Sequence, residues 1–326
     1  MKILSDQYGR KFEYLRLSIT DACNFRCQYC LPHGYKKTCE EDPLNYSEII
    51  NLVSAFAELG TWKVRLTGGE PTLRKDLIEI IAGIKNISGV KKIAISTNGS
   101  KLVALAPLLK KAGVSALNVS LDSLDCKTFD ALTGTSRGSE VLEGILETMK
   151  HSFDTIKINS VLLKKSSLAE FDRFEEWVKT NPISVRFIEL MPTGSTPEFF
   201  KENHVSSATV RIELQKRGWK VCDRKPGDGP AEEWAHPTAL GKLGIIAPYG
   251  PEFCSTCNRL RVSARGELRL CLFAEGNTSV RRLLKDPDQR EELKETLCTL
   301  VYGKDRTHYL PEGRYGNNFT FSAIGG

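Results

Sequence analysis

The stretch that organises this chain is Cys-Asn-Phe-Arg-Cys-Gln-Tyr-Cys, residues 23–30. Its cysteines are spaced so that one short loop can turn all three thiolates toward a common point. Three soft thiolates at one point suit an iron–sulfur cluster. A cubane of four irons held by three cysteines keeps one iron without a protein ligand, so we expect a substrate or cofactor to coordinate there.

Two other uses of these cysteines are weighed against a cluster. Zinc is often held by C-x2-C pairs, and His33 is near enough in sequence to supply a fourth ligand. A disulfide framework is disfavoured, because ten cysteines in 326 residues is a modest density and the first residues lack the apolar segment of a secretory signal. We therefore expect a cytoplasmic protein whose thiols stay reduced and available to metal.

The composition excludes several classes of protein. Apolar residues make up 40% of the chain and charged residues 26%, which is ordinary for a soluble globular protein. No apolar stretch reaches the length of a membrane span, so no membrane association is expected. The net charge of +6 permits an anionic substrate, but no basic stretch with interleaved aromatic residues predicts nucleic-acid binding.

Strand and helix patterns alternate from residue 13 to residue 190. Strands are predicted at 13–20, 62–67, 90–97, 114–121, 155–163 and 183–190. Helices are predicted at 47–59, 75–85, 102–112, 140–151 and 168–180, the first with Ser47 as its N-cap. Regular alternation is typical of a parallel α/β sheet, and six units predict an incomplete (β/α)6 barrel.

Distinctive residues follow the first four predicted strands. The cysteine loop comes after the first strand and Gly-Gly-Glu-Pro, residues 68–71, after the second. Ser-Thr-Asn-Gly, residues 96–99, closes the third strand and Ser-Leu-Asp, residues 120–122, closes the fourth. Gly-Gly and Asn-Gly are also ordinary turn dipeptides. Because the carboxyl ends of barrel strands meet at one rim, the four clusters together favour a single functional site.

The alternating pattern ends near residue 191, and the loop-like residues 225–230 divide the chain into expected domains at 1–225 and 226–326. The second domain carries Cys254, Cys257 and Cys271. Predicted strands at 260–263 and 267–271 form a hairpin that brings Cys271 back beside the C-x2-C pair. Zinc stays open here, because Cys298 or His308 could supply a fourth ligand.

Two arginines accompany this second cysteine group. Arg259 and Arg261 are two residues apart in a predicted strand, so their side chains point the same way. Guanidinium groups bind phosphate or carboxylate oxygens in pairs. An anionic ligand beside the second cysteine group is therefore expected, although a solvated strand face is the simpler alternative.

The C-x3-C-x2-C loop and the Gly-Gly-Glu-Pro motif resemble the radical S-adenosylmethionine superfamily. Within it, the chain is similar over essentially its whole length to the GTP 3′,8-cyclase family of molybdenum cofactor biosynthesis. The motifs that carry this resemblance are Asp-x-Cys-Asn-x-Arg-Cys-x-Tyr-Cys-x-Pro at 21–32, Arg-x-Thr-Gly-Gly-Glu-Pro at 65–71, Asn-Val-Ser-Leu-Asp at 118–122, Arg-Phe-Ile-Glu at 186–189, the late C-x2-C-x13-C with Asn-Arg-x-Arg at 258–261, and the Gly-Gly end.

The resemblance implies a partial (β/α)6 barrel, closed by a C-terminal extension, with a [4Fe-4S] cluster at each end of its cavity. Cys23, Cys27 and Cys30 would hold the first cluster, with S-adenosylmethionine on its open iron. Cys254, Cys257 and Cys271 would hold the second, whose open iron faces GTP. The implied reaction converts GTP to (8S)-3′,8-cyclo-7,8-dihydroguanosine 5′-triphosphate, the first step of molybdenum cofactor biosynthesis. In it the 5′-deoxyadenosyl radical removes the hydrogen on ribose C3′.

Individual site residues follow from the same resemblance. The implied S-adenosylmethionine contacts are Tyr29, Gly69, Glu70, Ser120 and Met191. The implied GTP contacts are Arg16, Arg65, Ser96, Lys157, Arg259 and Arg261. Ser96 stands where the family often has threonine, and it keeps the hydroxyl. The tail residues Gly325 and Gly326 would reach the active site, where a residue without a Cβ fits a narrow channel.

The resemblance also implies partners: GTP, a second copy of the chain in a homodimer, a downstream cyclic pyranopterin monophosphate synthase and a low-potential electron donor such as flavodoxin. One alternative is a peptide-modifying radical S-adenosylmethionine enzyme with an auxiliary cluster, although such enzymes typically carry more C-terminal cysteines. Another is a non-catalytic zinc or iron–sulfur module that binds nucleic acid, which the charge pattern disfavours.

Overall fold

The structure is a computed structural model, and it describes residues 3–37, 41–164, 167–224, 227–250, 252–316 and 320–322. Within these residues a single twelve-stranded sheet has the order β12-β11-β10-β1-β2-β3-β4-β5-β6-β9-β8-β7. The strands are β1 (Tyr14–Ser18), β2 (Lys63–Thr67), β3 (Lys92–Thr97), β4 (Ala116–Ser120), β5 (Thr155–Leu162), β6 (Ser184–Glu189), β7 (Lys220–Val221), β8 (Glu232–Ala235), β9 (Lys242–Ile246), β10 (Arg259–Val262), β11 (Glu267–Arg269) and β12 (Thr278–Ser279).

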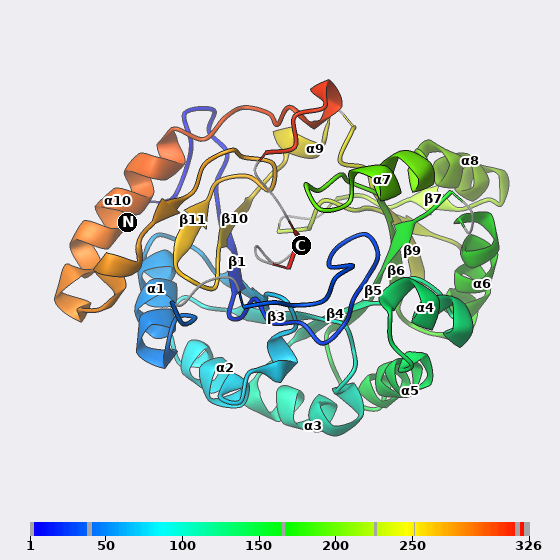
Figure 1. The fold of residues 1–326 in the computed structure, drawn as a ribbon, viewed down its shortest axis with the longest axis horizontal. Coiled ribbons are helices and arrows are strands. Elements are labelled where there is room, and N and C mark those ends of the chain that lie inside the picture. The colour runs from blue at the N-terminus through cyan, green and yellow to red at the C-terminus, as the bar shows by residue number, and fades with distance from the viewer. Residues whose placement is uncertain are drawn as a thin grey trace.

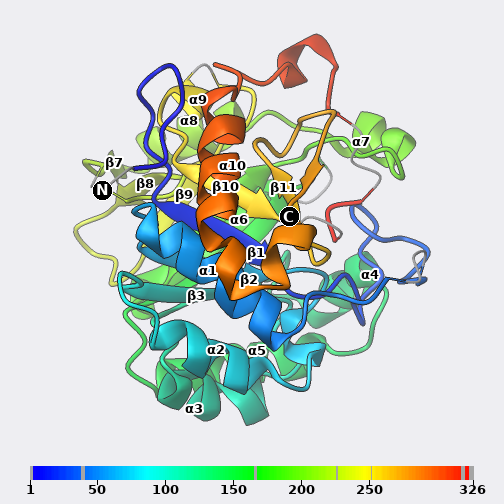
Figure 2. The ribbon, with the colours of Figure 1, turned by 90° about the vertical axis from the view of Figure 1, so that its left-hand side faces the viewer.

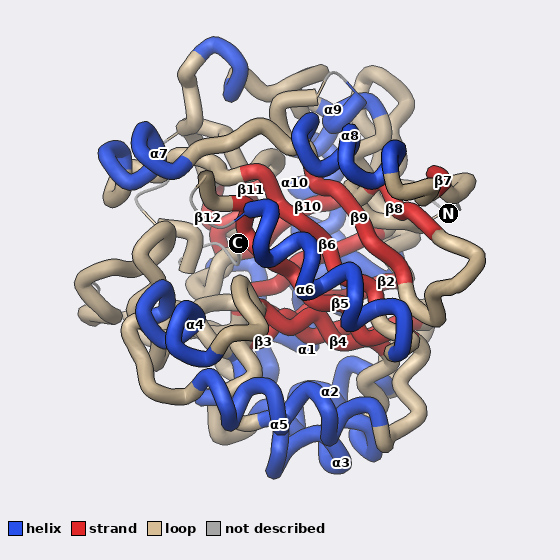
Figure 3. Tube along the Cα trace, turned by 90° about the vertical axis from the view of Figure 1, so that its right-hand side faces the viewer, coloured by secondary structure: helices blue, strands red, loops and turns tan. Residues whose placement is uncertain are grey.

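Helices surround this sheet. They are α1 (Tyr46–Glu58), α2 (Leu77–Lys85), α3 (Leu102–Ala112), α4 (Cys126–Thr133), α5 (Gly138–Met149), α6 (Ser167–Thr180), α7 (Pro197–Asn203), α8 (Ala208–Lys216), α9 (Glu252–Ser255) and α10 (Arg290–Tyr302). Short 3-10 helices are η1 (Pro71–Leu73), η2 (Arg281–Leu284), η3 (Pro287–Gln289) and η4 (Leu310–Glu312). Figure 1 shows α1, α2, α3, α5 and α6 following one another around the outside of the strands. Figure 3 shows α6 lying across the outer face of the sheet.

The expected parallel α/β sheet is confirmed for the six predicted strands, β1 to β6, which pair in chain order and all run parallel. The C-terminal third extends the same sheet at both ends. Strand β10 pairs parallel with β1, and β9 pairs parallel with β6. Figure 2 shows α10 beside α1, on the outside of β1 and β10. Residues after 226 therefore complete the sheet rather than forming a separate one.

The predicted hairpin is confirmed, because β10 and β11 pair antiparallel. Helices α4, α9 and α10 and strands β8, β9 and β12 lie outside the predicted elements. Between residues 194 and 225 the sequence predicts one helix and a short strand at 219–222, and the structure has α7, α8 and β7 there. Among the described residues, no helix combines the length and the apolar character that crossing a bilayer requires.

Helix α1 begins one residue earlier than expected. Asn45, not Ser47, is the N-cap: its side chain accepts a hydrogen bond from the Glu48 backbone N–H at 2.9 Å. The Glu48 carboxylate in turn accepts from the Asn45 N–H at 2.8 Å, which completes a capping box. The prediction of Ser47 as N-cap is wrong: Ser47 lies within the first turn of α1, and its hydroxyl donates to the side-chain oxygen of Asn45 at 2.8 Å.

The two faces of the strands differ in polarity. In β1, Leu15 and Leu17 are fully buried and belong to the apolar core. Residues that alternate with these are polar, and Arg16 lies beside Arg65 of β2 and Arg261 of β10 in the register of the sheet. Because successive side chains of a strand point to opposite faces of the sheet, the apolar side chains of β1 face the core and the polar ones face the inner side of the sheet, where the site lies.

Candidate functional site

The first cysteine group lies at the carboxyl end of β1. Cys23, Cys27 and Cys30 line a cavity of about 190 Å³, together with residues at the ends of β2 to β6. Backbone hydrogen bonds hold the loop to the end of α4: Arg26 N–H donates to the Thr133 carbonyl at 2.8 Å, and Gln28 N–H to that of Leu132 at 3.0 Å. The loop is thus fixed so that all three thiols face one space.

The glycine motif after β2 allows a very close backbone contact with this loop. Gly69 N–H donates to the Thr20 carbonyl at 2.9 Å, and Glu70 N–H to the Ala22 carbonyl at 2.7 Å. A Cβ on Gly69 would lie 2.2 Å from the Ala22 oxygen, and one on Gly68, whose φ is 141°, would lie 2.0 Å from the Thr20 oxygen. No other residue type fits either position without moving the loop.

Glu70 braces the cavity wall from behind. One oxygen of its fully buried carboxylate accepts from Thr72 N–H at 3.0 Å, from the Thr72 hydroxyl at 2.6 Å and from the Thr97 hydroxyl at 2.7 Å. The other oxygen accepts from Asn98 N–H at 2.6 Å. Burial raises the pKa of Glu70, and these donors oppose that rise. Glu70 is not among the residues that line the cavity, whereas a direct contact with the expected cofactor requires its carboxylate to reach the cavity.

A second brace joins the cysteine loop to β4 and β5. The Tyr29 hydroxyl donates to Asp122 Oδ2 at 2.6 Å, and Val161 N–H donates to Asp122 Oδ1 at 2.8 Å. Burial raises the pKa of Asp122 to about 6.

The first cavity contains most of the expected cofactor contacts. Four of them line it: Tyr29, Gly69, Ser120 and Met191. Ser96, an expected GTP contact, lines the same cavity. The structure thus brings them together.

The inner face of the sheet carries the expected basic residues. They lie on four strands, β1, β2, β5 and β10: Arg16, Arg65, Lys157, Arg259 and Arg261. Burial lowers the pKa of Lys157 to about 7, helped by the charge of Arg186. Burial also raises the pKa of Tyr14, but the charges of Arg65 and Arg16 outweigh it and the net pKa is lowered. The same face therefore concentrates positive charge.

Several buried polar atoms on this face have no hydrogen-bond partner among the described residues, which fits a site built for a polar ligand. They include Arg65 Nε, Ser96 Oγ and Asn159 Oδ1.

Two further cations of the sheet were not assigned to the site from the sequence. Lys63 precedes Arg65 by two residues in β2, and Arg186 of β6 lies opposite Asn159 in the register. The alternation of β2 and β6 was the signal that could have found them.

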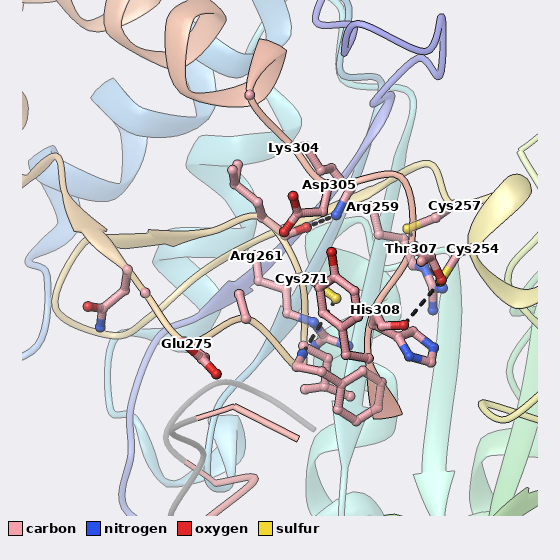
Figure 4. A pocket seen from close by; sticks show the side chains of 18 of the residues that line it. Cys254, Cys257, Arg259, Arg261, Cys271, Glu275, Lys304, Asp305, Thr307 and His308 are labelled. Atoms are coloured by element: carbon pink, nitrogen blue, oxygen red, sulfur yellow. Dashed lines mark hydrogen bonds between the residues drawn. The ribbon is translucent and has the colours of Figure 1, made fainter. Parts of the chain in front are cut away.

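The second cysteine group lines a separate cavity of about 460 Å³ (Figure 4). Its lining residues include Cys254, Cys257 and Cys271, with Arg259 and Arg261 beside them. Burial raises the pKa of the Cys257 thiol, but the charges of Arg259 and Lys304 outweigh burial, and the net pKa is lowered. At Cys30 of the first group, by contrast, burial raises the pKa to about 12. Cys257 and Cys30 therefore have opposite electrostatic surroundings.

The donor sets bear on which metal fits. Three thiols face each cavity, and such a soft set suits an iron–sulfur cluster. Of the proposed fourth zinc ligands, His308 lies in the second cavity wall, whereas Cys298 is not among its lining residues. Among the described side chains, no three of His, Cys, Asp and Glu converge closely enough to hold one metal ion.

The predicted contact between the C-terminal residues and the active site involves residues that the structure does not describe. Gly325 and Gly326 are outside the described residues. Phe321 and Ser322, however, line the first cavity, so the last described part of the chain reaches the first cysteine group.

Comparisons with known proteins show which families this chain resembles. The family model of the radical SAM superfamily matches residues 17–178, and the model described as Molybdenum Cofactor Synthesis C matches residues 183–310. GTP 3′,8-cyclase of Psychromonas ingrahamii is 46% identical over 323 residues, which cover 99% of this chain and 95% of that protein. GTP 3′,8-cyclase of Cronobacter sakazakii is 45% identical over 325 residues, covering 99% of both chains.

Solved structures show the same fold at low identity. Streptococcus suis SuiB bound to S-adenosylmethionine superposes with a TM-score of 0.64 at 13% identity, covering 90% of this chain and 68% of that one. The protein anSMEcpe with bound AdoMet and a peptide has a TM-score of 0.57 at 14% identity, covering 89% of this chain and 83% of that one. These likenesses support the fold alone.

Proposed function

The chain belongs to the GTP 3′,8-cyclase family of the radical S-adenosylmethionine superfamily, and we propose that it converts GTP to (8S)-3′,8-cyclo-7,8-dihydroguanosine 5′-triphosphate. The observation that carries this proposal is the basic inner face of the sheet. Arg16 lies in register with both Arg65 and Arg261, and Lys157 lies on β5 of the same sheet. A triphosphate is the ligand whose charge best matches so many buried cations.

Two [4Fe-4S] clusters and S-adenosylmethionine complete the proposed site. Cys23, Cys27 and Cys30 hold the first cluster, and Cys254, Cys257 and Cys271 hold the second. When bound, the first cluster and S-adenosylmethionine supply the radical chemistry at ribose C3′, and the second cluster orients the purine. The proposed arrangement is a partial (β/α)6 barrel formed by residues 1–225, closed by residues 226–326.

The protein's own side chains bind, orient and shield the reactants. Tyr29, Gly69, Ser120 and Met191 form the wall against which S-adenosylmethionine lies in this proposal. Arginine forks hold the phosphate oxygens, and Ser96 offers a hydroxyl to the nucleotide. Binding of the nucleotide in the closed cavity excludes water from the reacting carbons of the ribose and the purine. Gly325 and Gly326 enter the site at the tail, and Glu70 acts by holding the cavity wall.

The proposed partners follow from the chemistry. Reductive cleavage of a sulfonium requires a low-potential electron donor such as flavodoxin. The cyclic product requires a downstream enzyme, cyclic pyranopterin monophosphate synthase. A homodimer in the cytoplasm is the expected form of the protein.

Anaerobic turnover tests the function directly. The reconstituted protein is incubated with dithionite, S-adenosylmethionine and GTP, and both 5′-deoxyadenosine and the cyclic nucleotide are measured. We expect GTP to stimulate release of 5′-deoxyadenosine and to be consumed with it. Stimulation by a peptide or by another nucleotide, but not by GTP, would overturn the substrate assignment.

Two serine variants separate the roles of the two cysteine groups. Cys27→Ser is expected to abolish cleavage of S-adenosylmethionine, because it removes a ligand of the first cluster. Cys257→Ser is expected to retain uncoupled cleavage while losing cyclisation of GTP. Equal loss of uncoupled cleavage in both variants contradicts this division of labour.

A further inference from the structure

An N-terminal turn reaches the second cysteine group from the opposite end of the chain. Asp6 N–H donates to the Arg10 carbonyl at 3.2 Å, and Gly9 N–H donates to the Asp6 carbonyl at 3.1 Å. The flanking residues Leu4 and Phe12 are buried in the apolar core, and Phe12 N–H donates to the Leu4 carbonyl at 2.9 Å. The turn is therefore fixed against the apolar core by the residues on both sides of it.

From this turn, the side chain of Arg10 contacts three segments of the chain, at Asp6, at Cys254 and at residues 305–306. Its Nε donates to Asp6 Oδ2 at 2.6 Å, and its side chain is only 10% exposed. Its Nη1 donates to the Cys254 carbonyl at 3.1 Å and to the Arg306 carbonyl at 2.8 Å, and its Nη2 donates to the Asp305 carbonyl at 2.5 Å. A largely shielded guanidinium thus bonds to the backbone of a cysteine that we assign as a cluster ligand.

The carbonyl that Arg10 holds also shapes the C-x2-C turn. Cys257 N–H donates to the same Cys254 oxygen at 3.1 Å, so this oxygen closes the turn between the two cysteines. Helix α9, which carries Cys254, has only four residues and supplies few hydrogen bonds of its own. External donors therefore have a large share in fixing where the two thiols point.

Lys304 makes the matching contact on the other side of the cavity. It is buried, and its Nζ donates to the Leu270 carbonyl, immediately before Cys271. Lys304 directly precedes Asp305, whose carbonyl Arg10 holds, and both residues are drawn in the cavity wall in Figure 4. The two cations and residues 304–306 therefore link the backbone of Cys254 to that of the residue before Cys271.

We propose that Arg10 and Lys304 are positioning residues for the second cysteine site, forming a brace that holds the C-x2-C turn and Cys271 at the spacing a cluster needs. The brace rests on the proposed function, in which these cysteines hold a [4Fe-4S] cluster. Around this site, Arg10 and Lys304 donate to backbone oxygens and not to the thiols. Outer partners of metal ligands commonly contribute about 10–100-fold to metal affinity.

The test isolates the second cluster. In full-length protein whose first site is removed by Cys23→Ala, Cys27→Ala and Cys30→Ala, anaerobic reconstitution should give about four irons per chain. Iron release to a chelator is then followed with Arg10→Met or Lys304→Met added. Each variant is expected to release iron at least about tenfold faster. Lys11→Met, which removes an exposed charge next to Arg10, is the matched control and should keep the parent rate.

A companion measurement excludes general unfolding as the cause. With the first site intact, each brace variant should keep about four irons in the first cluster and cleave S-adenosylmethionine without GTP at the parent rate, within about twofold. Arg10→Lys, which retains a cation but not the fork, should release iron at an intermediate rate. Parent-like iron release in both methionine variants overturns the brace. A parent whose second site takes up no iron and sulfide instead overturns the proposed function, so the two failures are distinguishable.

Discussion

Replacing Glu70 with glutamine is expected to destabilise the protein even when no cofactor is bound. Three donors converge on one carboxylate oxygen, and Asn98 N–H points at the other. A glutamine can keep its carbonyl toward the three donors, but its NH₂ group then faces the Asn98 N–H. One charge-assisted hydrogen bond becomes a contact between two donors in a buried position.

The size of the effect follows from these contacts. Losing one charge-assisted bond costs about 1.5–3 kcal/mol, and the remaining three bonds weaken when their acceptor loses its charge. Removing a buried charge offsets part of this cost, since burial alone raises the pKa of Glu70. We expect the free energy of unfolding of Glu70→Gln to fall by about 2–4 kcal/mol.

Urea unfolding of the cluster-free, reduced protein measures this change without any contribution from bound cofactor. Glu79→Gln is the matched control, because Glu79 is exposed in the first turn of α2, and it should change stability by less than about 0.5 kcal/mol. Combining Glu70→Gln with Thr97→Val tests the assignment further, since residues in one hydrogen-bond network show coupling of about 0.5–3 kcal/mol. An unchanged unfolding free energy together with weakened S-adenosylmethionine binding would show that Glu70 acts on the cofactor, and would refute the reasoning.

Three further predictions concern other parts of the molecule. Gly69→Ala places a methyl group 2.2 Å from the Ala22 oxygen, so calorimetry should show S-adenosylmethionine binding weakened by at least about tenfold; parent affinity would contradict the close approach. Since the pKa of Lys157 is about 7 and a bound triphosphate raises it, GTP binding at about pH 8 should take up close to one proton. Affinity should therefore fall as pH rises above 7, and titrations in buffers of different ionisation enthalpy should show no such uptake for Lys157→Met; equal uptake in both proteins rejects the assignment. Asn45→Ala should lower the unfolding free energy by about 1 kcal/mol in urea, whereas Ser47→Ala should change it less; the reverse order would restore Ser47 as the cap.

Much of the fold could be predicted because its signals are local. The periods of apolar residues in β1 to β6 and the helices between them depend on each segment alone, and the observed bounds agree with the predicted ranges within a few residues. The hairpin of β10 and β11 was also predictable, because its turn residues lie between two short strands. The cap of α1 was misplaced, since Asn45 and Ser47 offer the same chemistry two residues apart and only the backbone geometry distinguishes them.

The candidate site was predictable where motifs carry it. Each group of three motif cysteines lines a cavity. The first of these cavities, at the carboxyl ends of the strands, is also lined by Tyr29, Gly69, Ser120 and Met191. Glu70 belongs to the same motif as Gly69, but it does not line the cavity, and its carboxylate oxygens accept hydrogen bonds from Thr72, Thr97 and Asn98. A motif specifies residue types and spacing, but the direction of a side chain depends on the donors that surround it.

From the sequence by itself one can determine the alternating parallel sheet, the two groups of three cysteines and the basic strands that suit a triphosphate. Only the tertiary structure decided that β10 joins β1 and β9 joins β6, and that Arg10 bonds to Cys254 across 244 residues of chain. The physical reason is that spacing along the chain encodes local geometry, whereas contacts between distant segments depend on which strands pair and which buried polar groups find partners.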